Sequence, residues 1–384
     1  MRIDKQLSKA ETRPRALILS TATGYGGAER SLEALLPAMA KHYHLHVLVE
    51  NNRHLARCRE ALNGTRVEIS CLPHMSRFIQ VLYGVVWLLR RAIRNPVFIL
   101  ANTNKSGFIV GAAVRLCPAL GGRTVLYIRD FQWCRLNFIT KALPDALYLF
   151  PSQALLDSPD YIASYLRPAG KLRWEVVPNI VMPTQSQAIE LPEELKSILY
   201  VLILASIGPW KGQLHLLNAL TNLPENIHAV LCGGITNPPY YAKLKEQVQR
   251  LNLENRVHFL PYWPNPEVLI RSAVCVAITS VAAQGGPETF GRIVIEAWQE
   301  QTPVIAFNIG GPKYIVTHEK DGLLVPEGDE VALGNAILRL MKDAELAETL
   351  TKNGFVRAQS DFNADVVYDL FAKALANTSN AAPC

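Results

Sequence analysis

Short apolar runs alternate with longer segments of helical periodicity along most of this chain. Many of the apolar runs contain β-branched residues, which is typical of strands that are buried on both faces of a parallel sheet. The longer segments repeat their apolar residues with the spacing of an amphipathic helix. The pattern therefore predicts an α/β protein whose parallel sheets are covered by helices.

The predicted elements form two sets. The first set has strands at 16–20, 45–50, 67–70, 97–101, 124–128, 146–150 and 174–177, with helices at 29–41 and 152–166 among the segments between them. The second set has strands at 200–205, 228–232, 257–260, 274–279, 304–307 and 323–325, followed by helices at 330–341 and 345–359.

Between the two sets, the stretch from 178 to 196 is rich in Pro, Gln and Glu and has no clear period, so it predicts a linker. A chain of 384 residues is long enough for two domains of roughly 150 to 200 residues each. We predict a Rossmann-like domain at 1–180, a linker at 181–197 and a second Rossmann-like domain at 198–361. A last helix, at 362–378, is predicted to pack back on the first domain.

Composition and charge narrow the class of protein only slightly. The chain is 49% hydrophobic and 19% charged, as in globular enzymes, and its formal net charge of +6 selects no partner by itself. The residues from Met1 to Arg15 lack the apolar core of a secretory signal. The 7 cysteines are scattered and contain no C-x-x-C pair, which argues against disulfides and a zinc site and predicts a cytoplasmic protein.

One apolar segment is flanked by arginines. The run from Phe78 to Leu89 is too short for a membrane span, which needs about 20 residues, and arginines lie at both of its ends. The segment 75–94 is typical of a basic amphipathic helix on a membrane surface. An ordinary half-buried helix with a solvated basic face would give the same pattern.

Glycines follow the first predicted strand in Thr23-Gly24-Tyr25-Gly26-Gly27-Ala28-Glu29. Such residues let the backbone approach an anion at the start of a helix. A dinucleotide fingerprint would need a third glycine where Glu29 stands, although Glu50 could act as its ribose-binding acid. A tight turn without a ligand is the remaining alternative.

The most informative motif is Gln284-Gly285-Gly286-Pro287-Glu288-Thr289-Phe290-Gly291, which leads into a predicted helix at 292–301. Backbone amides near Phe290 and Gly291 can point at a phosphate from this position. Glu296 lies in an almost entirely apolar stretch of the helix, where a carboxylate needs hydrogen-bond partners. Those partners are either sugar hydroxyls or a protein group such as an Arg.

These motifs resemble the retaining glycosyltransferases of family 4, which have the GT-B fold of two Rossmann-like domains facing across a cleft. The similar segments are Gly26-Gly27-Ala28-Glu29, Val177-Pro178-Asn179, Lys211-Gly212, the E-x7-E spacing of Glu288 and Glu296, Pro303-Val304-Ile305, Gly310-Gly311-Pro312 and Asp321-Gly322-Leu323-Leu324-Val325-Pro326.

The resemblance implies roles for individual residues. Glu288 would contact the donor sugar, Glu296 the ribose and Lys211 the diphosphate. Because Lys211 stands at a helix start in a glycine-containing loop, we also expect it to be exposed in the empty site. Gly26 and Gly27 would line the same pocket, Thr289, Phe290 and Gly291 would offer backbone amides, and the base would lie near Tyr262 and Trp263.

Two departures from the family pattern concern positive charge. The usual Arg before the Lys-Gly pair is missing from the region of Ser206, and a usual His is missing after the fifth strand, where Arg129 stands. Arg129 either supplies the second cation from across the cleft or is a structural partner of Asp130.

The resulting hypothesis is a retaining hexosyltransferase that uses a UDP- or GDP-sugar and a glycan, lipid-linked or small-molecule acceptor. It would act in polysaccharide or glycolipid biosynthesis at the inner face of the membrane, without nucleic acid. No D-x-D motif is present, so the reaction is predicted to be metal-independent and to need no cofactor. A nucleotide-sugar epimerase and a catalytically silent partner subunit are the alternatives.

Overall fold

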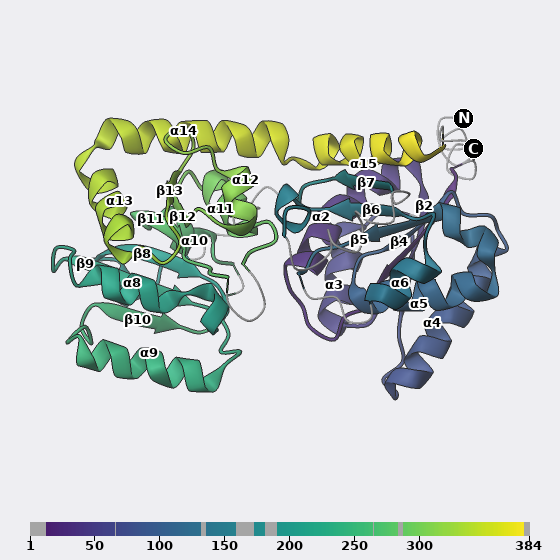
Figure 1. Ribbon diagram of the computed structural model, residues 1–384, viewed down its shortest axis with the longest axis horizontal. Helices are drawn as coiled ribbons and strands as arrows, with labels where there is room; N and C mark the ends of the chain where they lie inside the picture. Colours follow the sequence, from purple (N-terminus) through teal and green to yellow (C-terminus); the bar gives the residue numbers. More distant parts are fainter. Residues whose placement is uncertain are drawn as a thin grey trace. The chain divides into compact units, whose positions relative to one another are not determined.

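The computed structural model describes residues 13–65, 67–131, 136–158, 173–180, 190–263, 265–282 and 287–379 (Figure 1). The chain divides into two compact units. The first unit comprises Met1–Ile180 and Ala364–Cys384, and the second comprises Val181–Asn363.

The first unit is built on a 7-stranded sheet with the order β3-β2-β1-β4-β5-β6-β7, in which all neighbouring strands are parallel. Its strands are β1 (Arg15–Ser20), β2 (His44–Val49), β3 (Glu68–Cys71), β4 (Phe98–Ala101), β5 (Thr124–Tyr127), β6 (Leu147–Phe150) and β7 (Arg173–Val176). Its helices include α2 (Gly27–His42), α3 (Asn52–Ala61), α4 (Arg77–Ala92), α5 (Asn104–Leu116), α6 (Leu136–Ala142) and α15 (Ala364–Ser379).

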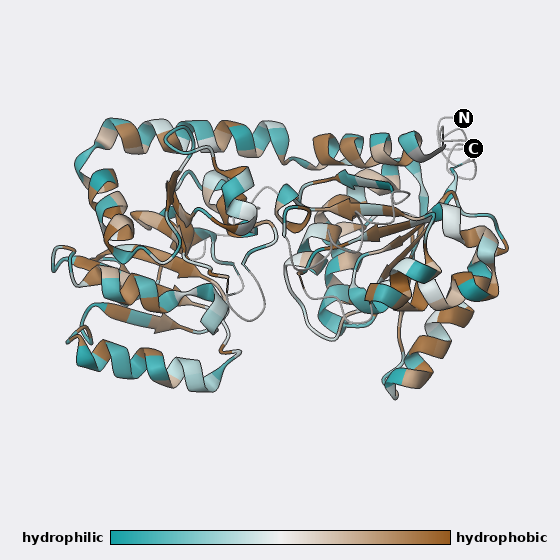
Figure 2. Ribbon diagram, viewed as in Figure 1, coloured by the Kyte–Doolittle hydropathy of each residue, from teal (hydrophilic) through white to brown (hydrophobic). Residues whose placement is uncertain are grey.

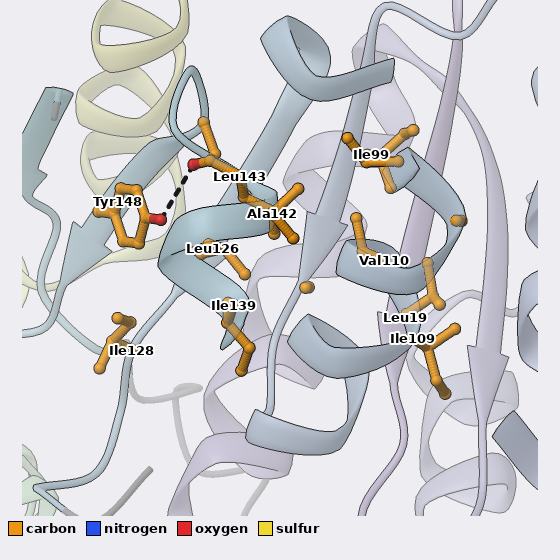
Figure 3. Close-up of a cluster of buried hydrophobic side chains, with 14 of the residues drawn as sticks. Leu19, Ile99, Ile109, Val110, Leu126, Ile128, Ile139, Ala142, Leu143 and Tyr148 are labelled. Atoms are coloured by element: carbon orange, nitrogen blue, oxygen red, sulfur yellow. Dashed lines mark hydrogen bonds between the residues drawn. The ribbon is translucent and has the colours of Figure 1, made fainter. Parts of the chain in front are cut away.

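Helices cover both faces of this sheet because its strands are apolar on both sides. In β1, Leu17 and Leu19 belong to one buried cluster, whereas Ala16 and Ile18 belong to another, as the alternation of a strand requires. Figure 3 shows part of the first cluster, where α5 and α6 pack on the strands and the Tyr148 hydroxyl donates a hydrogen bond of 3.0 Å to the Leu143 carbonyl.

The second unit has a 6-stranded sheet with the order β10-β9-β8-β11-β12-β13, also parallel throughout. The strands are β8 (Leu199–Leu204), β9 (Ile227–Cys232), β10 (Val257–Leu260), β11 (Cys275–Ile278), β12 (Val304–Phe307) and β13 (Leu323–Val325). The helices include α8 (Gln213–Leu220), α9 (Pro238–Arg250), α10 (Glu267–Arg271), α11 (Arg292–Gln299), α12 (Gly310–Ile315), α13 (Glu330–Lys342) and α14 (Ala344–Asp361). Figure 2 shows the hydrophobic colour concentrated along the strands of both units.

The last helix of the chain, α15, belongs to the first unit. Val367 and Phe371 of α15 are fully buried, and the ring of Phe371 meets that of Phe98 edge-on at 5.4 Å. An exposed ion pair of 2.7 Å joins Lys41 of α2 to Asp365. Burial of such side chains stabilises a fold by about 1.5 to 3 kcal/mol each, which explains why the chain returns to its first unit.

The structure differs from the helix predicted at 152–166 and describes only part of the predicted linker. The helix predicted at 152–166 is wrong at its start, because Gln153–Leu155 form a single 3-10 turn in which the Ser152 hydroxyl accepts a hydrogen bond from the Ala154 amide. Pro159 follows closely in the sequence and disfavours a helix in the residue before it. The rest of that prediction, and residues 181–189 of the predicted linker, lie outside the described residues. Within the described parts of the chain, none of the helices is both long and apolar enough to span a membrane.

Candidate functional site

The loop before α11 is fixed by two glycines from the start of α12. A Cβ atom on Gly311 would lie 2.3 Å from the Cα of Phe290, so only glycine permits this approach. The Gly311 amide donates a hydrogen bond of 2.6 Å to the Glu288 carbonyl, and Gly310 adopts a φ of 60° beside the same loop. The sequence pair Gly310-Gly311 therefore sets the position of the loop that carries Glu288.

Phe290 anchors the same loop in the core. Its side chain is 2% exposed and meets Phe362 edge-on at 5.8 Å. Gly291 then begins α11 with a φ of 85°, a conformation that favours glycine. Thr289, directly before Phe290, is half-buried. The first residues of the motif, Gln284, Gly285 and Gly286, lie outside the described part of the chain.

Lys211 and Glu288, predicted separately as diphosphate and sugar ligands, form an ion pair. The Ser280 hydroxyl donates a further hydrogen bond of 3.2 Å to Oε1 of Glu288. The side chains of Lys211 and Glu288 are only 18% and 22% exposed, so the expectation that Lys211 is exposed is wrong. The lysine is withdrawn from water because its partner is a carboxylate held in place by the loop before α11.

Hydrogen bonds to backbone carbonyls hold the loop of Lys211 against the end of β11. The Thr279 hydroxyl donates a hydrogen bond of 2.9 Å to the Lys211 carbonyl, and the Val281 amide donates one of 3.0 Å to the Trp210 carbonyl. Gly212 has a φ of 63°, and a Cβ atom there would lie 2.0 Å from the Thr279 carbonyl oxygen. Two loops at the carboxyl edge of the second sheet thus form one structure, which is where doubly wound sheets bind ligands.

Glu296, the second acid of the E-x7-E spacing, lies one turn into α11 and forms an ion pair of 3.0 Å with Arg292. Both side chains are nearly buried, with 10% and 12% exposed. The structure thus shows the arginine partner that the sequence left as one of two alternatives. The contact with ribose remains a prediction.

The two aromatic residues predicted near the base differ in exposure. Tyr262 follows β10 and is 47% exposed, whereas Trp263 packs partly against the core of the second unit. Tyr262 is therefore the better placed of the two to stack on a planar ligand.

In the first unit, the predicted residues Gly26 and Gly27 are exposed at the start of α2. The Gly26 amide donates a hydrogen bond of 2.8 Å to Oε2 of Glu29, which is 5% exposed. Glu29, the residue that breaks the dinucleotide fingerprint, therefore caps its own helix.

Glu50, the possible ribose acid of a dinucleotide site, already has a partner. Nζ of Lys105 lies 2.8 Å from Oε1 of Glu50 and donates a second hydrogen bond of 2.6 Å to the Gln80 side chain. This ion pair, together with the missing third glycine, disfavours a nicotinamide enzyme.

Arg129 is buried in a polar network. Its Nε donates a hydrogen bond of 2.8 Å to the Asn102 side chain, and its Nη1 donates another to that of Asn179. The guanidinium carbon lies 3.5 Å from the centre of the Tyr127 ring. Burial lowers the pKa of Arg129 from its usual value, but an arginine stays charged.

The network connects Arg129 to residues 23–29 before and at the start of α2, which we call the glycine loop. Nδ2 of Asn102 donates hydrogen bonds to the Ala28 carbonyl at 3.2 Å and to the Ser20 hydroxyl at 3.1 Å. Sequence reasoning did not nominate Asn102 as a functional residue, nor Ser280 in the second unit. The signal was present in both cases, because each polar residue follows an apolar strand almost directly and so lies at the ligand-binding edge.

Comparisons with known proteins agree with the geometry of the second unit. Residues 182–357 match the family model described as "Glycosyl transferases group 1". The matched range covers a little under half of the chain and lies within the second unit.

The lipopolysaccharide core biosynthesis glycosyltransferase LpsD of Rhizobium meliloti (strain 1021) is 31% identical over 170 residues, 43% of this chain and 47% of that protein. The human alpha-1,3/1,6-mannosyltransferase ALG2 is 32% identical over 146 residues, 36% of this chain and 34% of that protein. Each match thus spans less than half of the relative.

Solved structures resemble the chain over nearly its whole length. Anabaena Alr3699/HepE in complex with UDP-glucose has a TM-score of 0.76 at 23% identity, covering 95% of this chain and 100% of that one. Sucrose-phosphate synthase from Thermosynechococcus elongatus has a TM-score of 0.74 at 20% identity, with 96% and 100% covered. The predicted α/β fold class, with two Rossmann-like doubly wound units of the GT-B type, is confirmed.

Proposed function

We propose that this protein is a retaining glycosyltransferase of family 4, which transfers a sugar from a nucleoside-diphosphate donor to an acceptor hydroxyl. The observation that carries the proposal is the Lys211–Glu288 pair in the family-matched unit, held at the carboxyl edge of the sheet beside the glycine-supported start of α11. A cation, a carboxylate and helix amides in one place suit a phosphate joined to a sugar.

The donor would separate the two charges of this pair. Lys211 would turn to the diphosphate, whose negative charge grows as it leaves, and Glu288 would accept hydrogen bonds from the sugar hydroxyls. The acceptor oxygen would bond to the anomeric carbon while the bond to the diphosphate breaks, and the acceptor proton would pass to the departing phosphate oxygen. This route needs no protein nucleophile, and we nominate none.

The donor is proposed to be a UDP- or GDP-sugar. The similarity to a structure solved with UDP-glucose supports the first, and the partial match to a mannosyltransferase is compatible with either. We further propose that the transfer needs no magnesium or manganese, because Lys211 and the backbone amides at the start of α11 would meet the diphosphate. Equal turnover with and without added magnesium or manganese would agree with this proposal, and a requirement for either ion would contradict it.

We also propose that the acceptor is glycan or lipid-linked and that α4 rests on a membrane surface. One stripe of α4 and the turn before it is both apolar and exposed, with Phe78 at 78% and Leu82 at 54%. The hydrophobic colour runs along much of α4 in Figure 2. Arg77, Arg90 and Arg94 are exposed around this stripe. An ordinary half-buried helix would expose mainly its charged side, so these exposed apolar side chains favour a membrane contact.

The direct test of the reaction is release of free nucleoside diphosphate from donor sugars, with and without extracts that contain candidate acceptors. Release that depends on acceptor is expected. Isomerisation of the donor without acceptor would instead indicate an epimerase. No turnover and no nucleotide affinity in a folded sample would indicate a silent partner subunit.

A further inference from the structure

Three residues of the first unit bring metal-ligating atoms together in its interior. Glu33 lies on α2, and His54 and Cys58 lie on α3, with exposed fractions of 8%, 0% and 0%. One ligand atom from each lies within 4.8 Å of those of the other two. Among the residues that the structure describes, this is the one such group of three.

The local fold fixes the position of each member. His54 and Cys58 are four residues apart, so their side chains lie on the same face of α3. The Asn51 side chain caps α3 by accepting hydrogen bonds from the amides of Arg53 and His54, which sets where the helix begins. Helix α2 then presents Glu33 to this face.

The distances are close to those of a tetrahedral metal site. Nδ1 of His54 lies 2.6 Å from Oε1 of Glu33, and Sγ of Cys58 lies 3.7 Å from the same nitrogen. Ligands of a tetrahedral zinc ion are roughly 3.3 to 3.6 Å apart, given its bond lengths to nitrogen, oxygen and sulfur. Sγ of Cys58 also lies 4.0 Å from Nε2 of His54. Binding one ion through Nδ1 therefore needs a shift of the Glu33 carboxylate by under about 1 Å and a rotation of the Cys58 thiol toward Nδ1.

We propose that Glu33, His54 and Cys58 bind one transition-metal ion of the zinc class. A thiolate, an imidazole and a carboxylate suit zinc or cobalt, whereas magnesium and calcium prefer oxygen ligands alone. A divalent ion would also balance the thiolate and the carboxylate, so the buried group would carry no net charge. The fourth position is left for water or another oxygen.

This ion would position the glycine loop. The Tyr25 hydroxyl donates a hydrogen bond of 2.9 Å to Oε2 of Glu33. Tyr25 directly precedes Gly26. A metal that orients the Glu33 carboxylate would thus orient the loop through a neighbouring hydrogen bond.

The experiment measures metal content and does not depend on the proposed function. The full chain is produced in zinc-supplemented medium, passed through gel filtration and assayed for zinc by mass spectrometry. The proposal predicts about one zinc per chain, falling to below about 0.1 in Cys58→Ala and His54→Ala. Cys71→Ala, which removes a partly buried thiol of the same unit, is the matched control and should retain the zinc.

Cobalt provides a second readout if a variant fails to fold. Adding cobalt to metal-free wild-type protein should produce a thiolate-to-cobalt charge-transfer band in the near ultraviolet, and adding zinc should raise its melting temperature. Wild-type protein that is folded by circular dichroism, contains no zinc and gives no cobalt band would overturn the proposal. The three side chains would then form a hydrogen-bonded core group only.

Discussion

Lys211 and Glu288 neutralise one another in the absence of a donor, so a substitution of either residue has two consequences. It removes the proposed contact to the donor, and it leaves the other charge without its partner in a site that is about four-fifths buried. Because both side chains retain some exposure, the second consequence is moderated by water. The catalytic effect should therefore exceed the effect on stability.

Lys211→Ala is expected to reduce turnover by roughly a hundredfold to a thousandfold, the usual loss when one electrostatic contact to developing charge is removed. The effect should fall mainly on kcat, since the leaving diphosphate carries more charge in the transition state than in the bound donor. Steady-state kinetics would measure it. Lys243→Ala, on the exposed side of α9, is the matched control and should behave like wild type.

Arg129 allows a test of charge against structure. Arg129→Met keeps the bulk but removes the donor to the Asn102 oxygen and leaves the Asn179 oxygen with the Ser31 hydroxyl. The free energy of unfolding should fall by about 1 to 3 kcal/mol. If Arg129 also serves the diphosphate as a second cation, turnover should fall about a hundredfold. Arg129→Lys should then recover part of the turnover but little of the melting temperature. Normal turnover in Arg129→Met would leave Arg129 with a structural role alone.

At the residue scale, sequence reasoning nominated the members of the site better than it described their surroundings. It selected Lys211 and Glu288, which the structure joins, but it expected Lys211 to be exposed. It noted Arg129 but not Asn102, and it considered Asp130 as the partner. Contacts between side chains far apart in sequence depend on which strand ends lie next to one another. The periodicity of hydrophobic residues predicts the strands but not these contacts.

The start of α12 supports the loop before α11. Adding one methyl group at Gly311 would test this role. Gly311→Ala would place a Cβ atom about where the Phe290 backbone lies, at 2.3 Å from its Cα, so the loop of Glu288 must shift. We expect weaker nucleotide affinity and a melting temperature lower by several degrees, measured by calorimetry. Gly234→Ala, where a Cβ atom meets nothing within 4 Å, is the control in the same unit.

The exposed apolar stripe of α4 predicts that this helix binds a membrane surface. Flotation with anionic liposomes should carry the protein upward at low salt, and added salt should weaken this because part of the attraction is electrostatic. The double substitution Phe78→Glu and Leu82→Glu should abolish flotation. Leu116→Glu, at a side chain that is 71% exposed at the end of α5, should not. Flotation unaffected by the double substitution would exclude this face as the membrane contact.

At the element scale, the strands were the most predictable part of the fold. Each predicted strand is present within one or two residues, because a strand buried on both faces leaves a continuous apolar run in the sequence. The segment after β6 was less predictable. Its apolar residues have helical spacing, yet Ser152 and the nearby Pro159 favour a short turn at its start.

At the scale of the whole molecule, the two units carry different amounts of information about function. The family match lies at 182–357, within which all the contacts around Lys211, Glu288 and Gly311 are found. The first unit shares the fold with the solved structures but lies outside the matched range. The second unit therefore carries the evidence for the donor, and the exposed face of α4 in the first unit carries the proposal for the acceptor.

The central claim is that the second unit binds a nucleoside-diphosphate sugar, with Lys211 at the diphosphate and Glu288 at the sugar. Thermal unfolding in the presence of ligands tests it most directly. Wild-type protein and Lys211→Ala are melted with UDP, GDP, ADP and the corresponding nucleotide sugars. At least one diphosphate should stabilise wild type, by about 2.7 kcal/mol at one hundred times its Kd, and stabilise Lys211→Ala much less. A folded wild-type protein whose melting temperature no nucleotide changes would contradict the account.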